Sequence, residues 1–406
     1  MNSPFGKNFF QRISRSMVPM LTVAVVTTLS GGLPAFAQTE TAIYGFCRLT
    51  SCADGSEANG SLIRDSSGNL YGTTLEGGAH NGGTVYKLTL KGTETVLYSF
   101  GASSDDGTYP NQGVTMDSHG NLCGVTEDAG SHNAGTVFKV TPDGAETILH
   151  TFTSSPSDGA YPFGPVILDA KGNIWGTTSS GGRHGYGTIF RISSGGVEAI
   201  VHSFDPSTGD GDTPFSGLVV DRHGNFYGTT TAGGTYNAGI VFELTSKGVY
   251  SILYNFGSNA GDGNTVNSSV ILDAEGNVYG VTVLGGSSNN GIVFKLTPGS
   301  PWTETILYNF GGYSQSDGSQ PSGPLVIDSE GNLYGTTYQG GNYFLNAGTV
   351  FEVSPAGYET VLYDFVGNAD GAGPSGGLLR DSHGNLYGTA YRGGDFQNGV
   401  VYKVIP

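Results

Sequence analysis

Three histidines at equal spacing are the residues of this sequence whose types and positions most suggest chemistry. His80, His132 and His184 follow one another at intervals of 52 residues. Imidazole acts as an acid or base near neutral pH and is a common ligand of zinc and copper. Equally spaced histidines could therefore ligate a metal ion or line a binding surface, depending on how the chain positions them.

The same position carries other side chains further along the chain, namely Tyr236, Ser288, Tyr343 and Phe396. Three hypotheses follow: a metal site, an aromatic face that stacks on sugar rings or grips a peptide, and simple drift between duplicated repeats. Equivalent positions in neighbouring repeats are too far apart to share one ion, so we predict no metal site. The candidate ligand-binding residues are His80, His132, His184, Tyr236, Tyr343 and Phe396.

The elements that position these residues come from a repeat. The pattern Asp-x-x-Gly-Asn-apolar-aromatic-Gly occurs seven times, with Cys123 in place of the aromatic residue once. Its asparagines are Asn69, Asn121, Asn173, Asn225, Asn277, Asn332 and Asn385. Seven copies at a period of about 52 residues indicate a repeat architecture.

Each repeat contains four runs rich in β-branched and aromatic residues, which we name A to D in chain order. In the fourth repeat they are residues 218–221, 225–230, 239–244 and 251–256. Glycine, asparagine, aspartate and proline bound the runs, as expected for short antiparallel strands. The sequence predicts an all-β protein, a seven-bladed β-propeller with four-stranded blades.

The two ends of the chain predict how the ring closes. Run D follows run C six times, but the last repeat stops after run C at Pro406. A seventh run D stands instead at residues 41–46. We expect it to pair with residues 400–404 and complete the last blade, because this pairing removes an open sheet edge.

Two further repeated features are interpreted as turns. The aspartate of Asp-x-x-Gly-Asn accepts backbone hydrogen bonds between runs A and B, where a ring of calcium sites is the alternative. The D–A loop carries Asp-Gly at Asp54, Asp106, Asp158, Asp210, Asp262, Asp317 and Asp370. The alternative there is a ring of carboxylates around one end of the channel.

His150 and His202 replace a tyrosine of run D and are expected to be half-buried packing residues.

Composition and charge limit the classes of function. The chain has 406 residues and a formal net charge of −17, so a nucleic acid or an anionic membrane surface is an improbable partner. Residues 1–37 combine Lys7, Arg12 and Arg15, an apolar stretch and Ala35-Phe36-Ala37. This pattern predicts a signal peptide cleaved after Ala37, and hence a secreted propeller domain over residues 38–406 with no membrane span.

The cysteines fit an oxidising compartment. Cys47 and Cys52 lie close together in one loop, which predicts a local disulfide. Cys123 occupies an aromatic slot of the repeat and is expected to be buried.

The recurring Gly-Asn-Leu-Tyr-Gly-Thr-Thr, Asn-x-Gly-Thr-Val-Phe-Lys-Leu and Thr-x-Leu-Tyr-x-Phe segments resemble the GloVer tandem repeat of exported bacterial proteins. The resemblance covers nearly all of residues 41–406. It implies a secreted or surface propeller without a settled activity, and it supplies no catalytic residues.

Two functional hypotheses remain from the sequence. The first is a monomeric, cofactor-free binding module that recognises a carbohydrate or a cell-envelope protein through the rim formed by the D–A and B–C loops. The second is an extracellular polysaccharide hydrolase or lyase that acts from the same rim. Convergence of His80, His132 and His184 with Asp106, Asp158 and Asp210 in one deep pocket would favour the enzyme.

Overall fold

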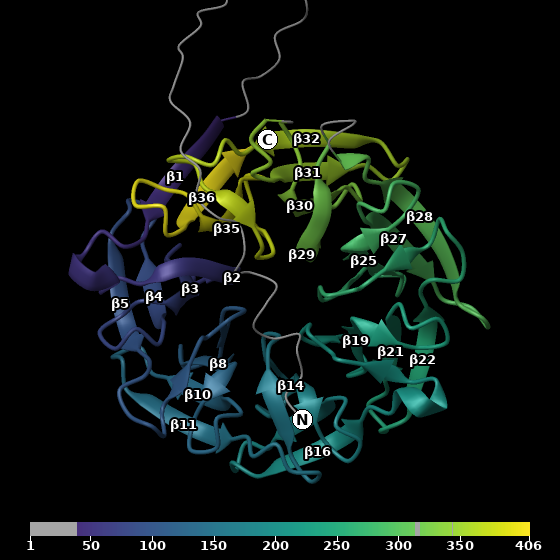
Figure 1. The fold of residues 1–406 in the computed structure, drawn as a ribbon, viewed down its shortest axis with the longest axis horizontal. Helices are drawn as coiled ribbons and strands as arrows, with labels where there is room; N and C mark the ends of the chain where they lie inside the picture. The colour runs from purple at the N-terminus through teal and green to yellow at the C-terminus, as the bar shows by residue number, and fades with distance from the viewer. Residues whose placement is uncertain (1–38, 313–316, 343) are drawn as a thin grey trace, which may run out of the picture. The chain divides into compact units, whose positions relative to one another are not determined.

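The computed structural model describes residues 39–312, 317–342 and 344–406. Seven four-stranded antiparallel blades stand in a ring, as Figure 1 shows, which confirms the predicted seven-bladed β-propeller. The predicted signal peptide lies outside the described residues. Among the described residues, no helix is long and apolar enough to cross a membrane.

The first four blades run from the inner to the outer strand as follows. Blade 1 contains β2 (Ser56–Arg64), β3 (Leu70–Glu76), β4 (Thr84–Leu88) and β5 (Glu94–Ser99). Blade 2 contains β7 (Thr115–Met116), β8 (Leu122–Thr126), β10 (Thr136–Val140) and β11 (Glu146–Thr151). Blade 3 contains β12 (Gly159–Pro162) with β13 (Ile167–Leu168), then β14 (Ile174–Gly181), β15 (Thr188–Ile192) and β16 (Glu198–Ser203). Blade 4 contains β18 (Val219–Val220), β19 (Phe226–Thr230), β21 (Ile240–Leu244) and β22 (Tyr250–Asn255).

The remaining blades follow the same order. Blade 5 contains β24 (Ile271–Leu272), β25 (Val278–Thr282), β27 (Ile292–Thr297) and β28 (Thr303–Asn309). Blade 6 contains β29 (Ser319–Ile327), β30 (Leu333–Gln339), β31 (Thr349–Val353) and β32 (Glu359–Asp364). Blade 7 contains β33 (Ala372–Pro374) with β34 (Leu379–Arg380), then β35 (Leu386–Arg392), β36 (Val400–Ile405) and β1 (Thr39–Gly45). Short pairs near the loops are β6 (Gly107–Thr108) with β9 (Asp128–Ala129), β17 (Gly211–Asp212) with β20 (Ala232–Gly233), and β23 (Gly263–Asn264) with β26 (Leu284–Gly285). Within the described ranges, 3-10 turns include η1 (Thr50–Cys52) and η2 (Pro206–Thr208).

The N-terminal strand closes the ring as predicted. β1 pairs antiparallel with β36, from Thr39 opposite Ile405 to Gly45 opposite Val400. In Figure 1 this strand lies at the outer edge of the blade formed by β35 and β36. The first and last segments of the propeller therefore belong to one sheet.

Aromatic contacts join neighbouring blades. Each run D ends in a phenylalanine with no exposed surface, and its ring packs against the aromatic side chain of run C in the next blade. The ring centroids lie 4.8–5.5 Å apart in the seven pairs Phe46–Tyr86, Phe100–Phe138, Phe152–Phe190, Phe204–Phe242, Phe256–Phe294, Phe310–Phe351 and Phe365–Tyr402. Such pairs add to the burial of apolar surface between the blades.

The Asp-x-x-Gly-Asn motif forms the turn that the sequence predicts. In blade 5 the Oδ1 atom of Asp273 accepts the backbone N–H groups of Glu275 and Asn277, at 3.0 and 2.8 Å. Its Oδ2 atom accepts the Asn277 amide and the Tyr279 hydroxyl, at 2.6 and 2.9 Å. These four hydrogen bonds from the turn itself satisfy both carboxylate oxygens of Asp273, and they explain the recurring position of the carboxylate within the turn without a bound cation.

Candidate functional site

The D–A and B–C loops lie on one face of the ring, which we call the loop face. Backbone hydrogen bonds join them, for example from Gly130 N–H to Asp106 O at 2.8 Å and from Gly182 N–H to Asp158 O at 2.6 Å. The loop face is therefore a continuous layer supported by the strands beneath it.

The Asp-Gly carboxylates are buried and do not form an exposed ring. All seven are at most 7% exposed. Each accepts a hydrogen bond or ion pair from the tyrosine or histidine near the end of run D, and most also accept backbone N–H groups of their own loop. This supports the interpretation of Asp-Gly as turn chemistry.

A third side chain from the next blade completes each of these groups, which we call the interface triads. It comes from the first part of the following run D and is a glutamate in six cases and Tyr250 in one. The triads are Tyr44–Asp54–Glu94, Tyr98–Asp106–Glu146, His150–Asp158–Glu198, His202–Asp210–Tyr250, Tyr254–Asp262–Glu304, Tyr308–Asp317–Glu359 and Tyr363–Asp370–Glu40.

Carboxyl groups share a poorly solvated space in the triads. Burial and the nearby Asp54 carboxylate raise the pKa of Glu94 to about 7, and burial and Asp317 raise that of Glu359 to about 8. The recurring glutamate of the triads can be seen in the sequence, because a glutamate precedes the run D tyrosine by four residues in most repeats. Only the fold shows that this glutamate faces the aspartate of the preceding loop.

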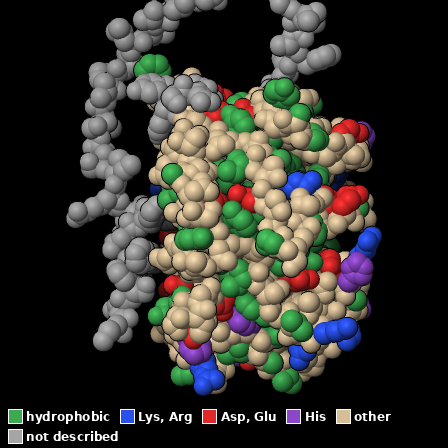
Figure 2. Space-filling view, turned by 90° about the vertical axis from the view of Figure 1, so that its right-hand side faces the viewer, with side chains coloured by type: hydrophobic (Ala, Val, Ile, Leu, Met, Phe, Trp, Pro, Cys, Tyr) green, Lys and Arg blue, Asp and Glu red, His purple; other side chains and the backbone are tan. Residues whose placement is uncertain are grey.

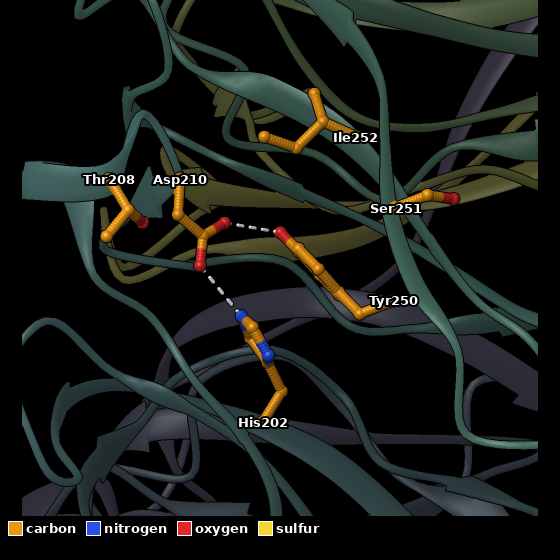
Figure 3. Close-up of a pocket in the computed structure, with 6 residues that line it drawn as sticks. All are labelled: His202, Thr208, Asp210, Tyr250, Ser251 and Ile252. Carbon is orange, nitrogen blue, oxygen red and sulfur yellow. Dashed lines mark hydrogen bonds and ion pairs between the residues drawn. The ribbon is translucent and has the colours of Figure 1, made fainter.

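Figure 3 shows the triad in which a tyrosine replaces the glutamate. The Tyr250 hydroxyl donates to Asp210 Oδ1 at 2.6 Å, and His202 Nε2 lies 2.8 Å from Asp210 Oδ2. The His202 and Tyr250 rings stack with centroids 3.8 Å apart. Thus His150 and His202 do more than pack, as they also bond to a buried aspartate.

A second set of residues of interest lies near the beginning of the inner strand of each blade. Three residues after each buried aspartate, the backbone has a positive φ of 54–62° in all seven blades. The residues are Glu57, Tyr109, Tyr161, Thr213, Thr265, Gln320 and Gly373. This conformation is uncommon for side chains other than glycine, and strain of this kind often occurs at functional sites.

The side chains at this position differ around the ring, and near it in blades 7, 1 and 2 lies a group of hydrogen-bonded polar side chains. The Tyr391 hydroxyl donates to Glu57 Oε2 at 2.6 Å, across the boundary between blades 7 and 1. The Asn59 amide donates to Asn111 Oδ1 at 2.7 Å, and the Asn111 amide donates to Glu127 Oε2 at 2.8 Å. We call Glu57, Asn59, Asn111, Glu127 and Tyr391 the inner cluster.

The surroundings of the inner cluster raise the pKa of both of its carboxyl groups. Burial raises the pKa of Glu57, the Tyr391 hydroxyl partly offsets this, and the Glu76 carboxylate adds to it. Burial likewise raises the pKa of Glu127, against the hydrogen bond from Asn111. The amide and hydroxyl groups of the inner cluster can both donate and accept hydrogen bonds, and its carboxyl oxygens accept them.

The opposite side of the ring lacks the carboxyl and phenol groups at the same positions, although Asn267 in blade 5 stands where blades 1 and 2 have Asn59 and Asn111. Blades 4 and 5 carry Thr213 and Thr265 where blade 1 has Glu57, and Thr231 and Val283 where blade 7 has Tyr391. The inner cluster is thus a local, asymmetric feature on a symmetric scaffold. Its residues are not grouped in the sequence, because runs A and B of different repeats meet only in the folded ring.

The residues singled out from the sequence lie apart from both groups. His80, His132 and His184 are exposed, as are Tyr236 at 53% and Phe396 at 45%. Tyr343 lies outside the described residues. His132 Nδ1 lies 2.9 Å from Ser131 Oγ, and His184 Nδ1 lies 3.5 Å from Asp205 Oδ2.

The structure does not bring the three histidines together with Asp106, Asp158 and Asp210. Those carboxylates point into the interface triads, while the histidines stand on exposed loops. The deep pocket that would have favoured an enzyme at these residues is therefore not formed by them. The six positions stay a predicted binding surface.

One side of the ring is visible in Figure 2. Hydrophobic, acidic and basic side chains are interspersed there, and no single kind covers the surface. This side therefore does not stand out as a binding surface, unlike the asymmetric inner cluster.

The fold and the repeated turns define a class, the seven-bladed β-propellers built from tandem repeats. Within it, residues 35–237 and 214–406 match the model of the Gloeobacter/Verrucomicrobia repeat. The chain belongs to this repeat family. No curated protein gives a significant sequence match.

Solved structures share the fold at low identity. Virginiamycin B lyase from Staphylococcus aureus is 13% identical, with a TM-score of 0.59, and the match covers 91% of this chain and 99% of that one. An extracellular domain from B. thetaiotaomicron, described as part of a hybrid two-component system, is 14% identical with a TM-score of 0.54. That match covers 90% of this chain and 41% of the longer one. At such identities the likeness concerns the fold alone.

Proposed function

We propose that this chain is an exported binding module that recognises a carbohydrate through its loop face, with the inner cluster at the centre of the site. The observation that carries the proposal is the one-sided gathering of tyrosine, amide and carboxyl side chains in blades 7, 1 and 2. Planar amide and carboxyl groups can bond to adjacent hydroxyl groups of a sugar, and tyrosine rings can stack on its apolar face.

The surroundings of the inner cluster support this proposal. Tyr109 and Tyr338 lie beside it, since nearby carboxylates including Glu57 act on the hydroxyl groups of both. Tyr161, at the equivalent position of blade 3, is 40% exposed. The outer residues His80, His132 and His184 on the same face would extend the contact surface for a longer glycan.

The experiment is a glycan array with the purified protein, followed by titration calorimetry with any ligand found. We expect Glu57→Gln and Tyr391→Phe each to weaken binding about tenfold, because the first replaces a carboxyl oxygen by an amide NH₂ group and the second removes a hydroxyl group. Glu57→Gln is compatible with the backbone, since Gln320 occupies the equivalent position in blade 6 with a φ of 56°.

Thr265→Ser is the matched control, at the same position on the opposite side of the ring. It should leave the affinity unchanged. Binding that survives Glu57→Gln and Tyr391→Phe but disappears in a His80→Ala, His132→Ala, His184→Ala variant would move the site to the outer loops. No glycan binding at all would leave an envelope protein as the ligand to test.

A polysaccharide hydrolase or lyase is the second candidate. The observation that favours it is the raised pKa of both Glu57 and Glu127, since a carboxyl group that keeps its proton can act as a general acid. Product analysis on the polysaccharides that bind would decide. Cleavage that is lost in Glu57→Gln or Glu127→Gln would establish the enzyme, and binding without cleavage would exclude it.

A further inference from the structure

One of the seven interface triads differs from the others in its set of donor atoms. His150 comes from β11 in blade 2, Asp158 from the D–A loop, and Glu198 from β16 in blade 3. The nitrogen and oxygen atoms that they offer all lie within 4.8 Å of one another. Among the described residues, this is the one group of three histidine, cysteine or acidic side chains that meets this condition.

The three side chains are already oriented toward a common point. His150 Nε2 lies 3.1 Å from Asp158 Oδ1, and the His150 ring packs edge-on against Phe152 with centroids 4.8 Å apart. Asp158 is 6% exposed and is held by the backbone N–H groups of Thr153 and Gly159, each within 2.9 Å. His150 and Asp158 are therefore held in position before any ion binds, and such fixed orientation of the ligands favours metal binding.

The Oε1 atom of Glu198 is buried and has no hydrogen-bond partner, and the same is true of the Oε1 atoms of the other five triad glutamates, so what sets this triad apart is the imidazole of His150 beside it. A buried carboxylate oxygen without a donor is costly, and a bound cation would remove that cost. His150 and Asp158 are the charged groups that act on this carboxyl.

We propose that His150, Asp158 and Glu198 form a binding site for a divalent transition metal ion that links blades 2 and 3. One imidazole nitrogen and two carboxylate oxygens form a ligand set that zinc accepts, with a fourth position left for water. Two carboxylates and a neutral imidazole also balance the charge of a divalent ion.

The other triads explain why the site is unique. Five have a tyrosine in place of His150, and a neutral phenol is a poor ligand. The triad of Figure 3 has His202 and Asp210 but carries Tyr250 in place of a glutamate, so it offers one ligand fewer. These natural variants supply substitutions that the blade interface accepts.

The test is calorimetric titration of Zn²⁺ into the purified protein after treatment with EDTA, with Co²⁺ absorption to report the coordination geometry. We expect one Zn²⁺ per chain. His150→Tyr and Glu198→Tyr, each of which copies another triad, should weaken binding at least tenfold. His202→Tyr, which makes the same change at the neighbouring triad, should leave binding unchanged.

Exposed histidines could bind Zn²⁺ weakly, so a His80→Ala, His132→Ala, His184→Ala variant is titrated in parallel and should keep the same binding event. If a tyrosine variant does not fold, as judged by circular dichroism, the smaller change Glu198→Gln replaces it. The proposal is overturned if the unaltered protein binds no Zn²⁺. It is equally overturned if His150→Tyr or Glu198→Gln binds Zn²⁺ as tightly as the unaltered protein.

Discussion

Single aspartates hold each repeat in shape. Asp273 and its six equivalents accept several donors in a turn, and Asp54 and its six equivalents do so in the D–A loop. In the turn, burial opposes ionisation, but the hydrogen bonds outweigh it and lower the pKa of Asp273. A residue present in all seven repeats therefore has a structural role in its own loop. The candidate functional residues are those that differ between the repeats.

The cysteines give a prediction at the residue scale. The sulfur atoms of Cys47 and Cys52 are joined in the structure, and Cys123 is 2% exposed. Thiol titration under denaturing conditions should therefore find one free thiol, and none should react in the native protein because Cys123 is buried. Three thiols in the denatured protein would refute the disulfide.

Neighbouring blades are held together by one aromatic pair and one interface triad at each boundary. The aromatic pair excludes water, and the triad places ionisable groups in the same poorly solvated zone. At the boundary between blades 4 and 5, the Tyr254 hydroxyl lies 3.0 Å from Glu304 Oε2 and 3.3 Å from Asp262 Oδ2. Neighbouring blades therefore contact each other through ionisable side chains whose charge depends on pH.

The triads predict how stability depends on pH. Burial, followed by the neighbouring aspartates, raises the pKa of Glu40, Glu94, Glu146 and Glu304 to about 7, above the value of 4.5 for the unfolded chain. The folded protein thus holds more protons than the unfolded chain between these values. Its free energy of unfolding must fall as the pH rises from about 4.5 to about 8.

We therefore expect a higher melting temperature at pH 5 than at pH 8.5. Glu94→Gln cannot ionise, so it should raise the melting temperature at pH 8.5 by about 2 °C and leave that at pH 5 nearly unchanged. Glu330→Gln, in an exposed turn, is the control and should change neither. A melting temperature that is higher at pH 8.5 than at pH 5 would contradict this account.

The whole molecule is a ring closed without a covalent bond between its ends. The β1 strand continues along the chain into blade 1, where the buried Phe46 ring packs on Tyr86, and its noncovalent pairing with β36 joins it to blade 7. The other six outer strands are continuous with their own blades. The boundary at β1 is therefore the point at which the ring can open.

This closure predicts different consequences for two equivalent substitutions. Phe46→Ala and Phe256→Ala should each lower the free energy of unfolding by about 3–5 kcal/mol, because each removes a fully buried ring. Only Phe46→Ala should make the N-terminal strand more sensitive to limited proteolysis, since only there can a terminal strand detach. Equal proteolysis of both variants would contradict noncovalent closure at β1.

The sequence by itself determined the blade count, the four runs of each blade and the closing strand. These follow from local patterns such as the spacing of Asn69 to Asn385 and the displaced run at residues 41–46, which need no knowledge of distant contacts. It also indicated the face on which the B–C and D–A loops lie.

Only the tertiary structure decided which side chains meet. The inner cluster joins Tyr391 to Glu57, which are 334 residues apart in the chain, and each interface triad takes residues from two blades. Such contacts depend on the ring closing and on the tilt of one blade against the next, which the spacing of residues along the chain does not encode. Consequently the sequence pointed to the exposed histidines, whereas folding gathered the polar groups at the inner strands and between blades.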